Sequence, residues 1–289
     1  MRAETPAISP DRILPEPQGV CPRCLGRGWT VVDDGGAGRA EPCSCRREKL
    51  VPRLVEYSGV PARYRGCTLD NFNTANANAR VRDALVRALR VSRRYVDDFV
   101  QRDGGFCDSG LLYVGPPGIG KTHLAAAVLL ELIRRYHVRG RFVDFTSLIH
   151  QIQATFEPTS EESKRQVLDP VIETELLVFD ELGAQKPTEW VRDTLYYVIN
   201  SRYTRRLPTI FTTNYPLERS AAPRPRGPLP GTDADVVEAV KRRPAAPAVE
   251  LLEERISAML VSRLYQMAQP LELGGLDYRR EVKRPRFGS

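Results

Sequence analysis

One stretch of the sequence combines glycine, lysine and threonine at a spacing that can hold phosphate. Residues 115–122 read GPPGIGKT and stand between the apolar run 110–115 and an apolar stretch that ends near residue 136. Glycines let the backbone curl so that successive N–H groups face an anion, and a helix N-terminus adds its dipole. Lys121 then reaches the β- and γ-phosphates of a nucleoside triphosphate, and the Thr122 hydroxyl ligates Mg²⁺. The residues expected to contact the nucleotide are Gly115, Pro116, Pro117, Gly118, Ile119, Gly120, Lys121, Thr122 and His123.

Acidic and amide side chains follow two later apolar runs. Asp180 ends the run ELLVFD (175–180) and Glu181 follows it directly, while Asn214 ends the run IFTTN. Asp180 is expected to hold Mg²⁺ together with Thr122, and Glu181 to polarise an attacking water. Asn214 could hold that water. Each has a simpler alternative, because an acidic pair can open a loop and an asparagine can cap a strand end.

Four of the six cysteines lie near the start of the chain at metal-ligand spacing. Cys21 and Cys24 form C-x2-C, and Cys43 and Cys45 form C-x-C. Four thiolates satisfy tetrahedral Zn²⁺ and leave no position for water, which predicts a structural site. The alternative is a set of reactive or unpaired cysteines. The remaining two, at positions 67 and 107, stand alone and are expected to be plain thiols.

Hydrophobic periodicity places these motifs on alternating strands and helices. Strands are expected at 110–115, 141–145, 175–180, 208–213 and in LELGG (271–275). Helices are expected at 80–101, 121–136, 146–156, 163–172, 188–205 and 250–268, with one further turn near 234–241. Strands that alternate with helices indicate an α/β fold with a doubly wound parallel sheet.

Composition shifts divide the chain into six segments. A Pro-rich tail is expected to be flexible, the Cys/Gly-rich part forms a small zinc-binding module, and the segment before the P-loop is a linker with an amphipathic helix. A Pro/Ala/Arg-rich insertion interrupts the ATPase core and is expected to be mostly disordered. The segments are 1–20 (tail), 21–60 (module), 61–109 (linker), 110–215 (core), 216–248 (insertion) and 249–289 (C-terminal part of the core).

The overall composition is that of an ordinary globular protein. Hydrophobic residues make up 42% and charged residues 27% of the 289 positions. No run approaches the roughly 18 apolar residues of a membrane span, and the N-terminus has no apolar core of a signal peptide. We therefore expect a cytoplasmic protein with no membrane partner. The net charge of +7 permits a polyanionic partner, although solvated surface charge explains it equally well.

Several motifs together resemble the AAA+ ATPases of the DnaC/IstB group, which contains bacterial replicative helicase loaders and transposition helper ATPases. The upstream segment VPARYRGCTLDNF (60–72) is similar to the segment before the ATPase core of helicase-loader-like members. The resemblance implies a three-layer P-loop AAA+ fold with a central parallel sheet. The motifs that carry it are GPPGIGKTHLAAAV, LLVFDELGAQKPTEWVRD, INSRYTRRLPTIFTTNYPLE and SRLYQMAQPLELGGLDYR.

The resemblance also implies roles for single residues. Walker A corresponds to 115–122, Walker B to Asp180 and Glu181, and sensor 1 to Asn214. Arg263 resembles the arginine finger that reaches the ATP of a neighbouring subunit, and Arg279 resembles the sensor 2 arginine. A finger supplied in this way means that the ATPase needs self-association through the AAA+ interface.

Arg255 is a rival for the finger. It lies eight residues before Arg263, whereas related sequences often place an ER pair four residues before the finger. Either arginine could also simply solvate a helix face.

As a helicase loader, the protein would bind single-stranded DNA (ssDNA) and the replicative hexameric helicase, with ATP as an assembly and release switch in replication initiation. The zinc module is then expected to dock on the helicase. A ssDNA path needs basic groups with aromatic or polar neighbours. The candidates are Phe145, Thr146, Lys164, Arg165, Arg202, Tyr203, Arg205 and Arg206. For any single one of them the simpler alternative is favoured, in which Tyr203 packs against the sheet and the arginines are solvated or bind acidic neighbours.

Three other functions are open. An IstB-type transposition helper uses the same core on a transposase and target duplex DNA. The motif CPRCLGRG resembles the CxxCxGxG units of DnaJ-type chaperones and would suggest a client-binding module, although only one such unit is complete. A small-molecule P-loop kinase would have no use for Arg263 and Arg279.

Overall fold

The computed structural model describes a large part of the chain in two units. The described residues are 21, 23–24, 29–32, 39–75, 79–102, 104–155, 163–185, 188–219 and 250–275. The expectations for the tail, for most of the 216–248 insertion with its helical turn, and for Arg279 lie outside them. One unit comprises Met1–Arg53 and the other Leu54–Ser289. The domain limits expected from composition stay a prediction.

The first unit contains a hairpin that brings its cysteine pairs together. Strand β1 (Trp29–Val32) pairs antiparallel with β2 (Arg39–Pro42), and helix α1 (Ser44–Tyr57) begins directly afterwards. Because the strands are antiparallel, the chain before β1 and the chain after β2 meet at the same end of the hairpin. These two positions carry the two cysteine pairs.

The second unit is built on a five-stranded parallel sheet. The strand order is β4-β5-β6-β3-β7, and every neighbouring pair is parallel. Strands β3, β5 and β6 are buried along their whole length, as their continuous apolar runs predict. The expected doubly wound sheet is confirmed. The strands are β3 (Gly110–Val114), β4 (Gly140–Asp144), β5 (Leu176–Asp180), β6 (Thr209–Thr213) and β7 (Ala268–Glu272).

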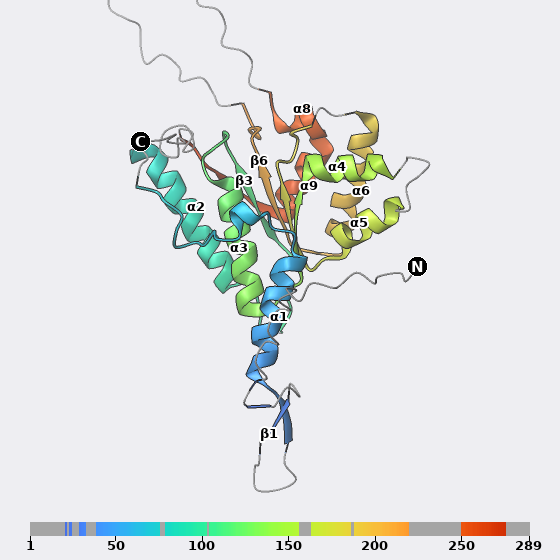
Figure 1. The fold of residues 1–289 in the computed structure, drawn as a ribbon. Coiled ribbons are helices and arrows are strands. Elements are labelled where there is room, and N and C mark those ends of the chain that lie inside the picture. The colour runs from blue at the N-terminus through green and yellow to red at the C-terminus, as the bar shows by residue number, and fades with distance from the viewer. Residues whose placement is uncertain are drawn as a thin grey trace, which may run out of the picture. The chain divides into compact units, whose positions relative to one another are not determined.

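Helices cover both faces of this sheet (Figure 1). On one face lie α2 (Ala79–Asp97) and α3 (Lys121–Tyr136), with the short η1 (Ala62–Tyr64) against α3. The opposite face carries α4 (Phe145–Ala154), α5 (Lys164–Glu173), α6 (Glu189–Thr204), α8 (Leu252–Ile256) and α9 (Ala258–Met267).

Within the described residues, no helix combines the length and apolar character that a membrane crossing needs.

Aromatic rings fill the core on the α4–α6 side. Phe145 packs edge-on against Phe179 with ring centroids 5.8 Å apart, and Phe211 lies beside Phe179. The expectation that Phe145 faces DNA is wrong. The side chain is 1% exposed because it begins α4 on the face that packs against the sheet.

Arg202 is also buried, which overturns its expected place in a DNA path. Its side chain is 1% exposed, and Nη1 donates to the carbonyls of Val171, Ile172 and Thr174 at 2.8–3.1 Å. Nε donates to Thr209 Oγ1 at 2.8 Å. The guanidinium thus satisfies carbonyls at the C-terminal end of α5, which no intrahelical N–H can reach. Burial lowers the pKa of Arg202 to about 9.

The helix expected over 250–268 is two helices. Ser257 separates α8 from α9 because its backbone has φ +116° and ψ 151°, outside the helical region. Its hydroxyl accepts from the Leu260 N–H at 3.4 Å and so caps α9. Apolar periodicity continues through the break, which is why the sequence pattern did not reveal it.

Candidate nucleotide site and metal centre

The glycine-rich loop turns sharply between β3 and α3. Gly115, Gly118 and Gly120 have φ values of 150°, 80° and 98°, where residues with a Cβ are strained. A Cβ on Gly115 would lie 2.0 Å from the Leu273 carbonyl oxygen, and one on Gly120 would lie 2.6 Å from the Phe72 ring. Conformation and space both require glycine at these two positions. The loop follows the carboxyl end of β3, whose neighbours in the sheet, β6 and β7, are not its neighbours in the sequence. Parallel sheets bind ligands at such positions.

The Lys121 ammonium lies inside this loop. Nζ donates to the carbonyls of Gly115 at 2.7 Å and Pro116 at 2.8 Å, and to Asn214 Oδ1 at 2.7 Å. The side chain is 6% exposed. A cation held among backbone groups at the start of a helix can neutralise a phosphate at short range. The structure therefore brings together two residues that the sequence singled out separately.

Asp180 and Thr122 form the other half of the site. Thr122 Oγ1 donates to Asp180 Oδ1 at 3.1 Å, and Thr212 Oγ1 donates to the same oxygen at 2.5 Å. Burial, supported by the charges of Glu181 and Asp144, raises the pKa of Asp180 to about 6, while the two hydroxyl bonds oppose this shift. A hydroxyl and a carboxylate are hard oxygen donors, so this pair fits Mg²⁺.

Two residues near Asp180 escaped the sequence analysis. Thr212 is the second threonine of IFTTN, and its Oγ1 also accepts from the Glu181 N–H at 3.0 Å. Asp144 pairs in register with Asp180 at the end of β4 and caps α4 by accepting from Ser147 N–H at 2.7 Å. Both lie on strands that neighbour β5, which sequence order does not show. A polar residue at the end of each buried strand is the signal that could have found them.

Glu181 is the first residue after β5, and its backbone adopts a left-handed conformation. Its φ is +58°, uncommon for a residue with a side chain, and its side chain is exposed. The bond from its N–H to Thr212 holds this turn. The Glu181 side chain is therefore exposed at the edge of the sheet, whereas Asp180 is buried.

Arg263 lies on α9 between two tyrosines of α6. Its guanidinium carbon is 4.9 Å from the ring centroid of Tyr196 and 5.7 Å from that of Tyr203. Nη2 donates to the Tyr196 hydroxyl at 3.3 Å. Nη1 is buried and finds no hydrogen-bond partner within the described residues. An unsatisfied guanidinium nitrogen is costly, so this side chain gains from an added acceptor.

Arg255, in contrast, is fully engaged within its own chain. Nε donates to the Gly183 carbonyl at 2.9 Å and Nη2 to that of Ala184 at 3.0 Å. Nη1 pairs with Glu250 at 3.3 Å, and the guanidinium stacks on Tyr215 at 4.8 Å. Arg255 therefore ties α8 to the loop that follows the Asp180–Glu181 pair. Among the described residues, Arg255 thus engages all three guanidinium nitrogens, whereas Arg263 donates one hydrogen bond, from Nη2.

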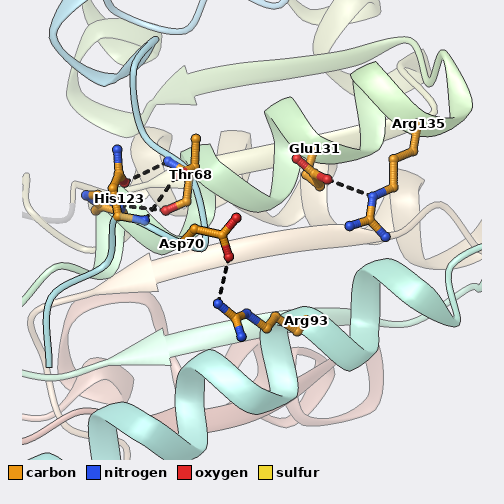
Figure 2. A network of polar contacts seen from close by, with 7 residues as sticks. Thr68, Asp70, Arg93, His123, Glu131 and Arg135 are labelled. Atoms are coloured by element: carbon orange, nitrogen blue, oxygen red, sulfur yellow. Dashed lines mark hydrogen bonds and ion pairs between the residues drawn. The ribbon is translucent and has the colours of Figure 1, made fainter.

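The upstream segment 60–72 packs on the first turn of helix α3 (Figure 2). His123 Nε2 lies 3.1 Å from the Thr68 carbonyl oxygen, and its ring meets Phe72 edge-on at 5.4 Å. Asp70 forms an ion pair with Arg93 of α2 at 2.8 Å. The segment is thus attached to both helices of this face, and through Phe72 it contacts the glycine-rich loop itself.

The four N-terminal cysteines form one cluster. Their four Sγ atoms all lie within 4.8 Å of one another. Cys21 and Cys43 Sγ are 3.8 Å apart, and Cys24 and Cys45 Sγ are 3.4 Å apart. A tetrahedral site with Zn–S bonds of about 2.3 Å places its sulfurs about 3.8 Å apart. The geometry therefore suits a structural metal ion, and the donor set suits Zn²⁺.

Residues 91–222 match the family described as IstB-like ATP binding protein. The chain carries an IstB-like ATP-binding domain. It is 27% identical over 175 residues to the replicative helicase loader DnaC of Escherichia coli K12, and 27% identical over 184 residues to YqaM of Bacillus subtilis 168. These alignments cover 60% and 62% of this chain, but only 65% and 56% of the relatives, less than two thirds of either.

Solved structures agree with the sequence relatives. The crystal structure of the DnaC helicase loader is 29% identical, has a TM-score of 0.54, and covers 74% of this chain and 99% of that one. The structure of DnaI has a TM-score of 0.52 at 20% identity, over 78% of this chain and 100% of that one, which supports the fold alone. The five-stranded parallel sheet with helices on both faces is the AAA+ fold of DnaC. The family resemblance and the fold expected from the motifs are confirmed.

Proposed function

We propose that this IstB-like protein is an ATP-dependent loader of the replicative helicase. The observation that carries the proposal is the convergence of Lys121, Thr122, Asp180 and Asn214 at one edge of a sheet like that of the DnaC loader. ATP binding, which is general to the family, would then serve as a switch for assembly on helicase and ssDNA and for release from them.

We assign the following roles at the nucleotide site. The loop from Gly115 to His123 holds the triphosphate of ATP, and Lys121 neutralises its β- and γ-phosphates. Thr122 and Asp180 hold Mg²⁺, which supplies charge neutralisation when bound. Glu181 orients and polarises the attacking water, and Asn214 positions the γ-phosphate or that water.

Hydrolysis in this proposal requires self-association. Arg263 acts as the finger for the ATP of a neighbouring subunit, a role assigned from its motif and favoured because the rival Arg255 is hydrogen-bonded within its own chain. Arg279 is proposed as the sensor 2 arginine on the grounds of the motif alone. The monomer should therefore be a poor ATPase.

The cysteine cluster is proposed to bind Zn²⁺ and to form a docking module for the helicase. The four sulfurs leave no coordination position for a substrate, so the metal would stabilise a small unit rather than catalyse a reaction. The ATP chemistry lies in the other unit, which is consistent with a separate docking role.

The decisive experiment is a pull-down of the replicative helicase from the same cell, with ATP and with ADP. We expect capture that depends on the nucleotide. Lys121→Ala should lose this dependence, and the exposed Arg134→Ala is a matched control on the same helix. If the wild-type protein fails to capture the helicase in either state, the loader proposal is wrong, while the ATPase proposal stands.

The alternative is a transposition helper that acts on a transposase and target duplex DNA. It is supported by the family description over residues 91–222. Filaments on duplex DNA together with capture of a transposase would favour it. The upstream segment 60–72 and the cysteine cluster favour the loader.

A further inference from the structure

An arginine–tyrosine cluster covers the outer edge of the sheet, away from the ATP site. Strand β4 is the edge strand, and the guanidinium carbons of Arg139 and Arg141 lie 6.0 and 5.3 Å from the Tyr57 ring centroid. Both arginines are therefore within cation–π distance of one ring. Tyr57, at the end of α1, remains 41% exposed.

A second arginine–tyrosine pair extends this cluster along the same strand. The Arg63 guanidinium lies 4.7 Å from the Tyr64 ring centroid, and the Tyr64 ring is 6.3 Å from that of Phe142 in β4. The Phe142 N–H donates to the Ser58 carbonyl at 2.7 Å, which holds the intervening segment against the strand. We call Tyr57, Arg63, Tyr64, Arg139 and Arg141 the β4-edge surface.

The three arginines of this surface have no carboxylate partner in the part of the chain that the structure describes. Some exposed arginines are paired, as Arg93 is with Asp70 and Arg135 with Asp97, whereas Arg134 and Arg192 also have no carboxylate partner among the described residues. Glu175, beside Arg139, accepts from the Arg139 backbone N–H at 2.7 Å instead of from its guanidinium. This surface is distinguished by three arginines without a carboxylate partner that lie beside two tyrosine rings, a combination that suits a ligand with both negative charge and flat rings.

We propose that the β4-edge surface binds single-stranded nucleic acid. The proposal rests on the loader function and adds a second contact region to it, apart from the nucleotide site. Arginines neutralise successive phosphates, and exposed aromatic rings stack on unpaired bases, the two contacts that hold a single strand without sequence preference. A folded acidic protein would satisfy the charges but would leave the exposed Tyr57 face without a stacking partner.

The first test is fluorescence anisotropy of a labelled oligo-dT with Arg139→Ala/Arg141→Ala at several salt concentrations. We expect affinity to fall roughly tenfold, and the slope of log K against log salt to shrink by about 1.4, since each phosphate contact to a single strand contributes about 0.7. Arg134→Ala/Arg192→Ala removes two exposed arginines elsewhere and should leave both quantities unchanged. Equal effects of the two pairs would mean general charge, and would overturn the proposal.

The second test addresses stacking at Tyr57. Tyr57→Leu should weaken binding roughly fivefold or more, whereas Tyr57→Phe should bind like the wild type, because a base stacks on either ring. Since Tyr57 is partly exposed, the thermal transition of both variants should match the wild type. If Tyr57→Leu and Tyr57→Phe bind oligo-dT equally well, the ring has no stacking role and the proposal is wrong.

Helicase capture separates this inference from the loader function. Arg139→Ala/Arg141→Ala should still capture the helicase with ATP. If it loses the helicase and keeps oligo-dT affinity, the surface binds protein and the nucleic-acid proposal is wrong. If wild-type protein captures the helicase but does not bind oligo-dT, the loader function stands and this inference fails.

Discussion

Lys121 and Asn214 are 93 positions apart in the sequence, yet Lys121 Nζ donates to Asn214 Oδ1 at 2.7 Å. The contact exists because β3 and β6 are neighbours in the sheet and both end at this edge. It connects the lysine proposed to bind phosphate to the side chain proposed to sense the γ-phosphate. The contact joins the two halves of the proposed ATP site.

Asn214→Ala should separate catalysis from binding. We expect ATP affinity to change less than threefold, because Lys121 and the loop remain. The catalytic rate of the assembled protein should fall about 10- to 100-fold, since a positioning contact at the γ-phosphate is lost. Steady-state ATPase rates and nucleotide titrations measure the two effects. A large loss of ATP affinity with an unchanged rate would contradict this role.

The stability of the nucleotide-free protein should depend on the ionisation of Asp180. Because the pKa of Asp180 is about 6 in the folded protein against an ordinary 3.8, the folded state binds the proton more tightly than the unfolded state does. This contribution is fully present below about pH 4 and is lost as pH rises through 6. It amounts to roughly 3 kcal/mol by the size of the shift.

Asp180→Asn tests this linkage. The free energy of unfolding of the variant should exceed that of the wild type at pH 8, and the difference should shrink as pH falls to 4. Denaturant unfolding without nucleotide or metal measures it. A difference that does not change with pH would exclude this titration as its cause.

Arg263→Ala should remove the ATPase activity that depends on assembly. Mixed with subunits that carry Glu181→Gln, it should regain part of the rate, because each partner then supplies what the other lacks. ATPase rates over a range of protein concentrations and mixing ratios measure this. If Arg263→Ala subunits alone hydrolyse ATP at the wild-type rate, the finger is another residue.

Tyr196 and Tyr203 should position Arg263. Leucine at both sites removes the two rings over the guanidinium and should lower the assembled rate severalfold, whereas phenylalanine keeps the rings and should restore most of it. The ATP affinity of the subunits should not change in either variant.

Arg202→Met should destabilise the second unit. It leaves the carbonyls of Val171, Ile172 and Thr174 without their shared donor, at a cost of about 3 kcal/mol in the free energy of unfolding. Chemical denaturation measures the loss, and the exposed neighbour Arg206→Met is the matched control. DNA affinity of the folded variant should equal that of the wild type, since Arg202 is buried.

The cysteine cluster should bind one Zn²⁺ per chain by elemental analysis. Cys21→Ser/Cys24→Ser should lose the metal and the helicase and keep nucleotide binding. Cys67→Ser, which changes a cysteine outside the cluster, should keep all three. A cluster variant that lost ATP binding and retained the helicase would contradict the proposed division of roles.

Most of the sequence predictions that the structure confirms rest on residues that are close together in the chain. A strand, a glycine turn and a helix with Lys121 at its start are adjacent in the chain, so the P-loop could be recognised without tertiary information. The parallel sheet followed from apolar runs that alternate with helical periodicity. Zinc-type spacing marked the cysteine cluster in the same way.

Only the tertiary structure decided which distant residues meet and which charged residues are buried. Thr212 reaches Asp180 because β6 lies beside β5. Arg202 of α6 is buried because its guanidinium donates to the carbonyls at the end of α5 and to Thr209 of β6. The spacing of apolar residues cannot reveal either relationship, because hydrogen-bond partners depend on the order of the strands and on where the helices end in space. The sequence by itself determined which chemical groups stand at each strand end; the order of the strands determined which of those groups lie together.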